Sequence, residues 1–223
     1  ICSYLKQGGK ADCVVMDDGF QHRQLHRDLD IAVLDYLRDV LAQKMLPAGW
    51  LREPVVGLQR ADAVVITHAQ RCEPTYAEKI EKLTGKEPVA WAAHHWTVLC
   101  VHETSGEHEE GLDWLTGKSV AVRLGIGHPR PVVEALVRLG AKIAQQLPAG
   151  DHQPFSQREL GVLAKTSTEV DAIVMTMKDW VKARDVIDLT TLHCPIVVPH
   201  LKLEIMEGEA GFESLLLSVF KLR

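Results

Sequence analysis

The chain has 223 residues, of which 46% are hydrophobic and 25% charged, so it has enough apolar side chains for a folded core and is not disordered by composition. Its net charge of −5 and its pI of about 6.1 argue against the basic surface that neutralises nucleic-acid phosphates, so we expect no nucleic-acid partner. No stretch approaches the roughly 20 apolar residues that a membrane-spanning helix requires, so we expect any membrane contact to be peripheral.

The predicted elements begin with a helix over residues 1–7, which Gly8 and Gly9 end. Apolar, β-branched runs then recur and predict strands buried on both faces, while segments with apolar residues at helical spacing predict helices between several of them. The predicted strands are 13–16, 31–34, 63–66, 120–122, 142–146, 173–175 and 196–198, and the predicted helices are 75–83, 131–139, 157–163 and 212–220. This alternation predicts an α/β fold of mainly parallel sheet covered by helices.

Residues 89–116 have a different composition, with three tryptophans beside a polar, acidic stretch. They predict two extended segments and a loop that link two α/β lobes. We therefore expect a first lobe over residues 1–92, a linker over 93–116 and a smaller second lobe over 117–223.

Cysteine usage indicates the redox state of the chain. The five cysteines are odd in number and include no CxxC pair; they are Cys2, Cys13, Cys72, Cys100 and Cys194. This pattern argues against disulfides and structural zinc and is typical of reduced, cytosolic thiols.

Two adjacent carboxylates, Asp17 and Asp18, follow the first predicted strand directly and precede Gly19, Phe20, Gln21 and His22. Open α/β sheets bind ligands at the carboxyl ends of their strands, and carboxylates there are suited to Mg²⁺ and, through it, to nucleotide phosphates. Asp-Gly sequences also form ordinary turns, so from the two acids alone a turn and a metal site are equally favoured.

Two further sites carry candidate residues. Arg52 and Glu53 form a charged pair between Gly49 and Pro54, and for the two residues taken alone an ordinary surface ion pair is favoured. The alternative is that Arg52 binds a phosphate, for which its planar fork is suited. Asp151 and His152 precede a helix that Ser156 and Glu159 are expected to start with a capping box. His152 is suited to relay a hydroxyl proton, although an exposed loop histidine is the commoner explanation for the residue taken alone.

Two strand-to-helix junctions are weaker candidates for anion binding. Residues 125–129 form a glycine-containing turn that opens a helix, and they serve either to bind an anion or only to reverse the chain. Thr176, Lys178 and Asp179 begin another helix, where a cap with solvated charges is the plain alternative. The histidines 94, 95, 102 and 108 match no usual metal-ligand spacing and are expected to face solvent.

The motifs, in their order along the chain, resemble those of the tetraacyldisaccharide 4'-kinase family of lipid A synthesis. The resemblance covers residues 10–182 and rests on the sequences DDGFQHR at 17–23, RDLDI at 27–31, LPAG at 46–49, LREP at 51–54, GIGHP at 125–129, DHQPF at 151–155 and TMKDW at 176–180. Two positions depart from it: Met177 stands where the family usually has an acid, and Trp50 where it commonly has proline.

The resemblance implies a P-loop kinase fold that uses ATP and Mg²⁺ to phosphorylate the 4'-hydroxyl of a lipid A disaccharide precursor at the cytoplasmic face of the inner membrane. It implies that Asp17 and Asp18 are Walker B acids near Mg²⁺, with Asp18 also catalytic. It further implies substrate binding by Gln21, His22, Arg52, Glu53 and Lys178, and proton handling by His152 with Asp151.

One expected motif is not found: no GxxxxGK[ST] loop occurs in the 223 residues. In the family this loop, a catalytic acid and the membrane-associating segment all precede the DDGFQH motif. We therefore expect a fragment of a longer protein with no kinase turnover by itself. Two alternatives stay open: a non-catalytic binding protein derived from the same fold, and a metal-dependent phosphohydrolase that uses Asp17, Asp18 and His152.

Overall fold

The computed structural model describes residues 8, 11–149 and 155–221, and the chain forms two compact units. Unit 1 comprises residues 1–93 and 204–223, and unit 2 comprises residues 94–203. The chain passes between them within β3 (Ala90–Glu103) and again within β8 (Ile196–Glu207). The expected boundaries at 92 and 116 remain a prediction. The expected pair of extended segments is confirmed, because β3 pairs with antiparallel β4 (Gly106–Glu110).

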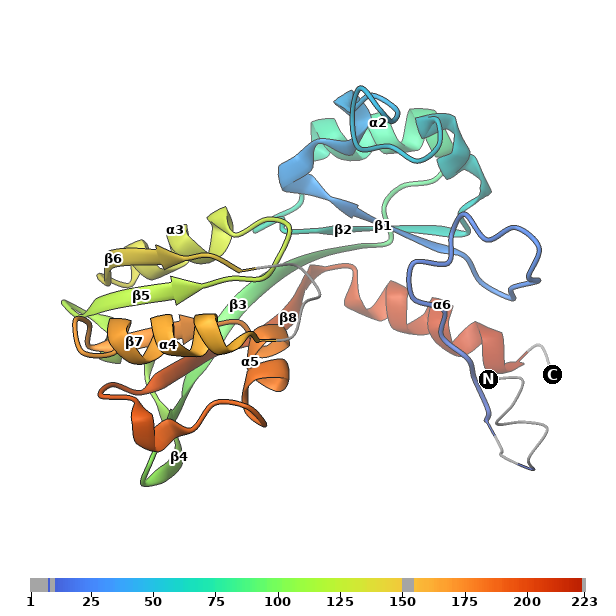
Figure 1. Cartoon of the computed structure of the whole chain (residues 1–223). Helices are drawn as coiled ribbons and strands as arrows, with labels where there is room; N and C mark the ends of the chain where they lie inside the picture. The colour runs from blue at the N-terminus through green and yellow to red at the C-terminus, as the bar shows by residue number, and fades with distance from the viewer. Residues whose placement is uncertain (1–7, 9–10, 150–154, 222–223) are drawn as a thin grey trace. The chain divides into compact units, whose positions relative to one another are not determined.

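Unit 1 is built on the parallel pair of β1 (Ile31–Asp35) and β2 (Ala63–Thr67), and β2 also pairs with the first residues of β3. Helix α2 (Pro74–Thr84) covers one face of these strands (Figure 1). Its Tyr76 and Ile80 pack in one core with Ile66 of β2, which is fully buried. Three short 3₁₀ helices complete the connections: η1 (Tyr36–Arg38), η2 (Val40–Ala42) and η3 (Val55–Arg60).

Helix α6 (Glu209–Lys221) belongs to unit 1 and follows a glycine that has no replacement. Gly208 has a φ of +85°, and a Cβ there would lie 2.1 Å from the carbonyl oxygen of Val89. Only glycine allows both this conformation and this close approach of two backbones. The chain therefore turns from β8 into α6 at Gly208, where its conformation and the nearby Val89 carbonyl require glycine.

The strand predicted at residues 13–16 is not formed, which corrects the expected Walker B strand. These residues have no regular structure, and Val15 is 87% exposed. A strand buried on both faces needs hydrogen-bonded neighbours and covering helices. Within the described chain β1 is the end strand of the sheet, with β2 as its partner, and residues 13–16 pair with neither.

Unit 2 contains strands in the hydrogen-bonded order β3-β8-β7-β5-β6, and β8, β7, β5 and β6 run parallel. Here β5 is Ser119–Arg123, β6 is Lys142–Leu147 and β7 is Ala172–Met175. Helix α3 (Arg130–Arg138) contributes Leu136 to one core, while α4 (Gln157–Thr166) and α5 (Met177–Ala183) contribute Leu163 and Trp180 to another. The short helices η4 (Leu112–Leu115) and η5 (Leu189–Thr191) lie in connections.

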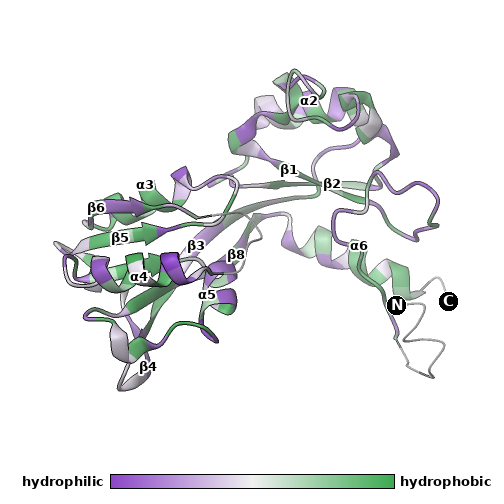
Figure 2. Ribbon diagram, in the orientation of Figure 1, coloured by the Kyte–Doolittle hydropathy of each residue, from purple (hydrophilic) through white to green (hydrophobic). Residues whose placement is uncertain are grey.

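The two cores explain why the strands differ in composition. All four residues of β7 are buried, whereas edge strand β6 reads Lys-Ile-Ala-Gln-Gln-Leu, with half of its residues hydrophilic (Figure 2). A central parallel strand is covered on both faces, and an edge strand faces water on one side. The predicted α/β fold class, with a mainly parallel sheet and flanking helices, is confirmed.

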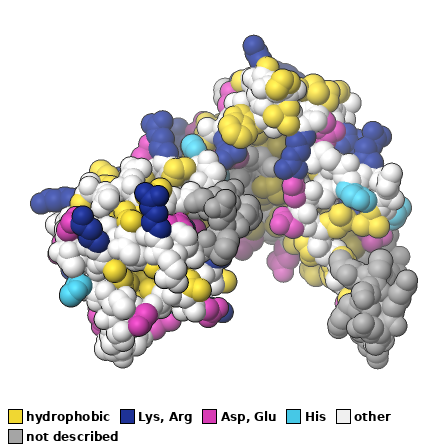
Figure 3. Space-filling view, in the orientation of Figure 1, with side chains coloured by type: hydrophobic (Ala, Val, Ile, Leu, Met, Phe, Trp, Pro, Cys, Tyr) yellow, Lys and Arg dark blue, Asp and Glu magenta, His cyan; other side chains and the backbone are white. Residues whose placement is uncertain are grey.

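On the face shown in Figure 3, lysine and arginine side chains are scattered among acidic and neutral ones. In the part of the chain that the structure describes, no helix combines the length and the apolar character needed to cross a bilayer.

Candidate functional site

The Asp17–His22 segment, here called the 17–22 loop, folds as consecutive turns. Asp18 has a φ of +52°, a left-handed conformation that aspartate tolerates better than most residues. The backbone nitrogen of His22 donates to the carbonyl of Gly19 at 2.9 Å. Gly19 is buried, and a Cβ there would lie 2.9 Å from the Cβ of Met16. The loop therefore requires glycine at this position.

Arg27 forms hydrogen bonds to the backbone of the 17–22 loop. Its Nη1 donates to the carbonyl of His22 at 2.6 Å and to that of Gly19 at 3.3 Å, and its Nη2 donates to Asp30 at 2.9 Å. Carbonyls at the end of a turn need donors, and a guanidinium supplies several in one plane. The arginine of the RDLD motif thus has a structural role that its sequence position did not reveal.

The second motif, here called the 51–54 loop, follows a tight turn over residues 44–51. The backbone nitrogens of Leu46 and Leu51 donate to the carbonyls of Leu51 and Lys44, at 2.9 and 3.1 Å. A Cβ on Gly49 would lie 2.2 Å from the Lys44 carbonyl oxygen, so the turn admits only glycine there. Arg52 and Glu53 directly follow this turn in the chain.

The two loops meet although more than 30 residues separate them. Nη1 of Arg52 lies 2.6 Å from Oδ2 of Asp18, with the two side chains 58% and 66% exposed. Nε2 of Gln21 donates to Oε1 of Glu53 at 3.3 Å. The structure thus places Asp18, Gln21, Arg52 and Glu53 together, while the role of each residue remains a proposal.

Two residues that the sequence analysis did not single out join the loops. Nη2 of Arg60 lies 2.9 Å from Glu53, and its guanidinium carbon lies 4.8 Å from the centroid of the Phe20 ring. The hydrogen bond from Arg60 is the main reason that the pKa of Glu53 is lowered. No spacing rule signals such a residue, because its partners come from two distant segments.

The remaining acids and histidine of the 17–22 loop are on the surface. Asp17 and His22 are exposed, and the described residues contain no cluster of three His, Cys, Asp or Glu side chains placed around one metal position. Mg²⁺ does not require such a cluster, because it keeps several waters and takes one or two carboxylates together with phosphates. The exposed carboxylates of Asp17 and Asp18 fit that donor set.

In unit 2 a buried network links the carboxyl ends of β5 and β7. Arg123, at the end of β5, contacts Asp179 at 3.4 Å and Glu159 at 3.1 Å, and its guanidinium carbon lies 3.6 Å from the centroid of the Phe155 ring. Asp179 also accepts the backbone N–H of Gly125 at 2.9 Å and the hydroxyl of Thr176 at 2.7 Å. The network therefore joins Gly125 of GIGHP, Phe155 and the TMKDW motif.

The structure places the other predicted residues of unit 2 unevenly. Lys178 is exposed in the first turn of α5, which Thr176 caps by accepting from the backbone of Asp179. The predicted capping box of Ser156 and Glu159 at the start of α4 is confirmed. Asp151 and His152, like the predicted helix over residues 1–7, lie outside the described residues.

The expectation that all four clustered histidines face solvent is wrong for His102. It is buried, stacks on Trp180 with ring centroids 4.2 Å apart, and lies 3.2 Å from Glu107. Burial, partly opposed by Glu107, lowers the pKa of His102. The strand β3 turns this side chain toward the core, which the local sequence does not show.

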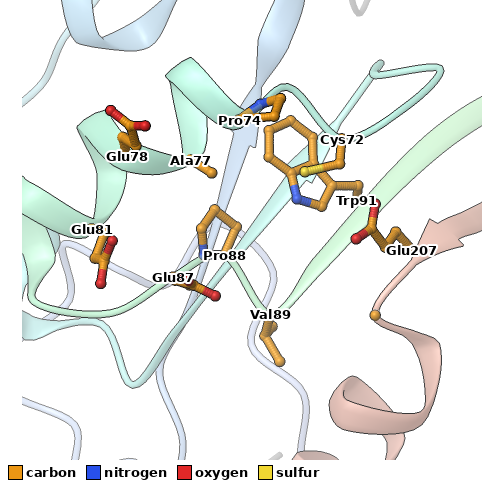
Figure 4. Close-up of a pocket in the computed structure, with 11 residues that line it drawn as sticks. Cys72, Pro74, Ala77, Glu78, Glu81, Glu87, Pro88, Val89, Trp91 and Glu207 are labelled. Atoms are coloured by element: carbon orange, nitrogen blue, oxygen red, sulfur yellow. The ribbon is translucent and has the colours of Figure 1, made fainter.

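A separate cavity of about 310 Å³ lies in unit 1 and does not include the motif residues. Figure 4 shows Cys72 beside Trp91, with Glu78 and Glu81 along α2 and Glu87 and Glu207 nearby. Burial raises the pKa of Cys72, and the nearby Glu207 adds to this shift. Its carboxylates disfavour a phosphate, so this cavity is not the candidate site.

Comparisons with known proteins agree with the motifs. The chain is 36% identical over 171 residues to the tetraacyldisaccharide 4'-kinase of Geobacter sulfurreducens, and 35% identical over 178 residues to that of Anaeromyxobacter sp. strain K; each match covers 77% of this chain and 46% of the relative. A third relative, from Syntrophus aciditrophicus, is 31% identical over 95% of this chain and 58% of its own length. The chain therefore spans about half the length of the curated relatives it matches.

The fold is also found in a solved structure. A crystal structure of LpxK from Aquifex aeolicus in complex with ATP matches with a TM-score of 0.56 and 24% identity, over 91% of this chain and 56% of that one. The sequence pattern that defines the tetraacyldisaccharide-1-P 4'-kinase family matches residues 2–221. With nearly the whole chain matched, and with the motif loops joined in one site, this chain belongs to the tetraacyldisaccharide-1-P 4'-kinase family.

Proposed function

We propose that this chain supplies the metal- and phosphate-handling part of an ATP-dependent kinase that phosphorylates the 4'-hydroxyl of a tetraacyldisaccharide 1-phosphate. Family membership supports the reaction class. The observation that carries the proposal is the meeting of the 17–22 and 51–54 loops, with Asp18 on Arg52 and Gln21 on Glu53. These two contacts place a carboxylate, an amide and a guanidinium from distant segments within reach of one ligand.

The exposed Asp18–Arg52 pair has the chemistry for a metal-bound phosphate. Asp17 and Asp18 are the residues that would hold Mg²⁺, which when bound neutralises phosphate oxygens. Arg52 is the residue that would bind a phosphate, because its planar guanidinium matches two phosphate oxygens. An exposed ion pair contributes little to stability, so Asp18 and Arg52 can exchange each other for a cation and an anion at small cost.

The proposed substrate and membrane contacts follow from family membership. His22 lies in the same loop as Gln21, and we assign both, with Glu53 and Lys178, to substrate binding. His152, with Asp151 orienting its ring, accepts the proton of the attacking sugar hydroxyl in this proposal. ATP is the phosphoryl donor, as the ATP complex of the Aquifex aeolicus relative supports. The lipid substrate implies a peripheral site of action at the cytoplasmic face of the inner membrane.

A chimera tests the proposal directly. The matched segment of the Geobacter sulfurreducens kinase is replaced by the corresponding residues of this chain, and ATP-dependent phosphorylation of tetraacyldisaccharide 1-phosphate is measured with Mg²⁺. We expect activity, and we expect Asp18→Asn and Arg52→Met to reduce kcat by at least about 100-fold, the scale for removing one group that stabilises transition-state charge. An active chimera that Asp18→Asn and Arg52→Met leave unchanged would contradict the assignment of this site.

The 223-residue chain serves as the comparison. We expect no kinase turnover from it, because it has no GxxxxGK[ST] sequence to cradle ATP phosphates. Hydrolysis of phosphate esters by the chain with Mg²⁺ or Mn²⁺ would instead support the phosphohydrolase alternative. Phosphate binding without turnover in either protein would support the binding-protein alternative.

A further inference from the structure

Arg60 contacts both motif loops, the 51–54 loop through Glu53 and the 17–22 loop through Phe20. It ends η3, and its Nη2 lies 2.9 Å from both carboxylate oxygens of Glu53. The same guanidinium lies over the ring of Phe20, with 4.8 Å between its central carbon and the ring centroid. One side chain thus contacts the 51–54 loop through charge and the 17–22 loop through an aromatic face.

The backbone of η3 makes room for this contact. A Cβ on Gly57 would lie 2.6 Å from Oε2 of Glu53 and 2.9 Å from Nη1 of Arg60. The φ of Gly57 is not in the left-handed region, so alanine there would leave the backbone unstrained and would force the Glu53 and Arg60 side chains to shift. Glycine at this position therefore serves the Glu53–Arg60 pair.

Arg60 and Arg52 hold their acids in different surroundings. The Arg60 and Glu53 side chains are 30% and 25% exposed, about half the exposure of the Arg52–Asp18 pair. Glu53 also accepts from Gln21, so its carboxylate is fixed from two sides. An arginine with a carboxylate, an aromatic ring and a tight backbone around it is not free to turn toward a ligand.

We infer that Arg60 is the positioning residue of the site: it holds the carboxylate of Glu53 against Gln21 and joins the two loops, so that they bind a metal and phosphate as one unit. The inference rests on the proposed function for its metal and phosphate. Arg60 acts through Glu53 and Phe20, because its guanidinium is occupied by these two contacts. A residue of this kind sets affinity by orienting the groups that touch the ligand.

Three variants of the 223-residue chain test the inference by NMR. Arg60→Met removes the guanidinium at similar length, Arg60→Lys keeps the charge without the planar fork, and Gly57→Ala pushes the pair apart from the backbone side. Arg71→Met is the matched control, because Arg71 also lies 2.9 Å from a glutamate, Glu73, and is far more exposed. The readouts are the titration of the Glu53 carboxyl carbon, the side-chain amide shifts of Gln21, and Mn²⁺ affinity measured from the paramagnetic broadening of the 17–22 loop.

We expect Arg60→Met and Gly57→Ala to raise the pKa of Glu53, to shift the Gln21 amide and to weaken Mn²⁺ binding by about 10-fold, the lower end for residues that orient metal ligands. Arg60→Lys should lie between these variants and the parent chain, and Arg71→Met should match the parent. Far-ultraviolet circular dichroism confirms that each variant is folded. If Arg60→Met or Gly57→Ala unfolds, the folded variant of the two is compared with Arg60→Lys and the parent chain.

The outcomes separate the inference from the function. If a folded Arg60→Met or Gly57→Ala leaves the Glu53 titration and the Gln21 shifts unchanged, Arg60 does not position Glu53 and the inference is overturned. If those two signals change while the parent chain shows no Mn²⁺ broadening in the 17–22 loop, the metal site of the proposed function is wrong, and the joining of the loops by Arg60 stands.

Discussion

Unit 1 and unit 2 each contain an arginine–carboxylate pair between residues far apart in the chain, but the two pairs differ in solvent exposure. Arg52 and Asp18 of unit 1 are 58% and 66% exposed, whereas Arg123 and Asp179 of unit 2 are 4% and 3% exposed. A charge pair in water is screened and easily exchanged, and one removed from water is costly to break. The same residue types therefore form an exposed pair in one unit and a buried structural pair in the other.

The contrast shows why a motif does not identify the role of each of its residues. Asp179 and Asp18 both lie in sequences that resemble the family's motifs, and both contact an arginine. Asp179 is surrounded by donors from Gly125, Thr176 and Arg123, so none of its oxygens is available to a ligand. Asp18 keeps most of its surface in water and can exchange its partner.

Breaking the buried pair is the strongest test of this contrast. Arg123→Met should lower the free energy of unfolding of unit 2 by about 3–5 kcal/mol, because it leaves Asp179 buried without its cation. Urea unfolding measures the loss, and hydrogen exchange of the Gly125 amide reports whether the buried network has opened. A loss below about 1 kcal/mol would show that the pair behaves as a surface one.

Substitution of Gly49, in the turn before Arg52, should lower stability more than substitution of Arg52 itself. Gly49→Ala places a Cβ 2.2 Å from the Lys44 carbonyl oxygen, so we expect a loss of about 1–3 kcal/mol from forced backbone movement. Thermal unfolding measures it. The matched control is Gly85→Ala, where nothing lies within 4 Å of the added Cβ and only the positive φ opposes the change.

Acid should weaken unit 2 through Glu159. Hydrogen bonds from the backbone and the hydroxyl of Ser156, each at 2.8 Å, lower the pKa of Glu159 below its ordinary value of 4.5. A carboxyl with a lowered pKa stabilises the fold above its unfolded value, and this contribution is lost as the pH falls through the folded value. The fall in stability on acidification below about pH 4.5 should therefore be shallower in Glu159→Gln than in the parent chain.

Stability measured by urea unfolding over this pH range checks that prediction, and Glu213→Gln serves as the control, because Glu213 is an exposed glutamate on α6. Identical slopes for the parent and Glu159→Gln would contradict it. The effect should be smaller than that of Arg123→Met, because the Glu159 side chain is 27% exposed and neutral glutamine keeps the shape of the side chain.

The smallest change in stability should follow loss of the exposed pair. Arg52→Met should lower the free energy of unfolding by about 1 kcal/mol or less, because both members of the pair remain solvated. The same variant is expected to impair the active chimera strongly. A large loss of stability would mean that Arg52 holds the 17–22 loop in place and is not available to a ligand.

Much of the fold followed from hydrophobic pattern. The runs at residues 63–66 and 173–175 are buried on both faces, and adjacent β-branched, apolar residues of this kind are typical of a central parallel strand. The capping box of Ser156 and Glu159 was equally local, since its bonds join residues three apart. The run at 13–16 has the same pattern but no strand, because pairing depends on a neighbour that the run itself does not encode.

By itself the sequence determined most strands and helices after residue 30, the capping box of α4 and the family motifs, because these depend on residues close together in the chain. Only the tertiary structure decided that Asp18 meets Arg52, that Arg60 joins Glu53 to Phe20, and that Arg123 and His102 are buried. Those contacts join segments that lie far apart in the chain, and solvent exposure, which distinguishes an exchangeable charge from a structural one, is a property of packing.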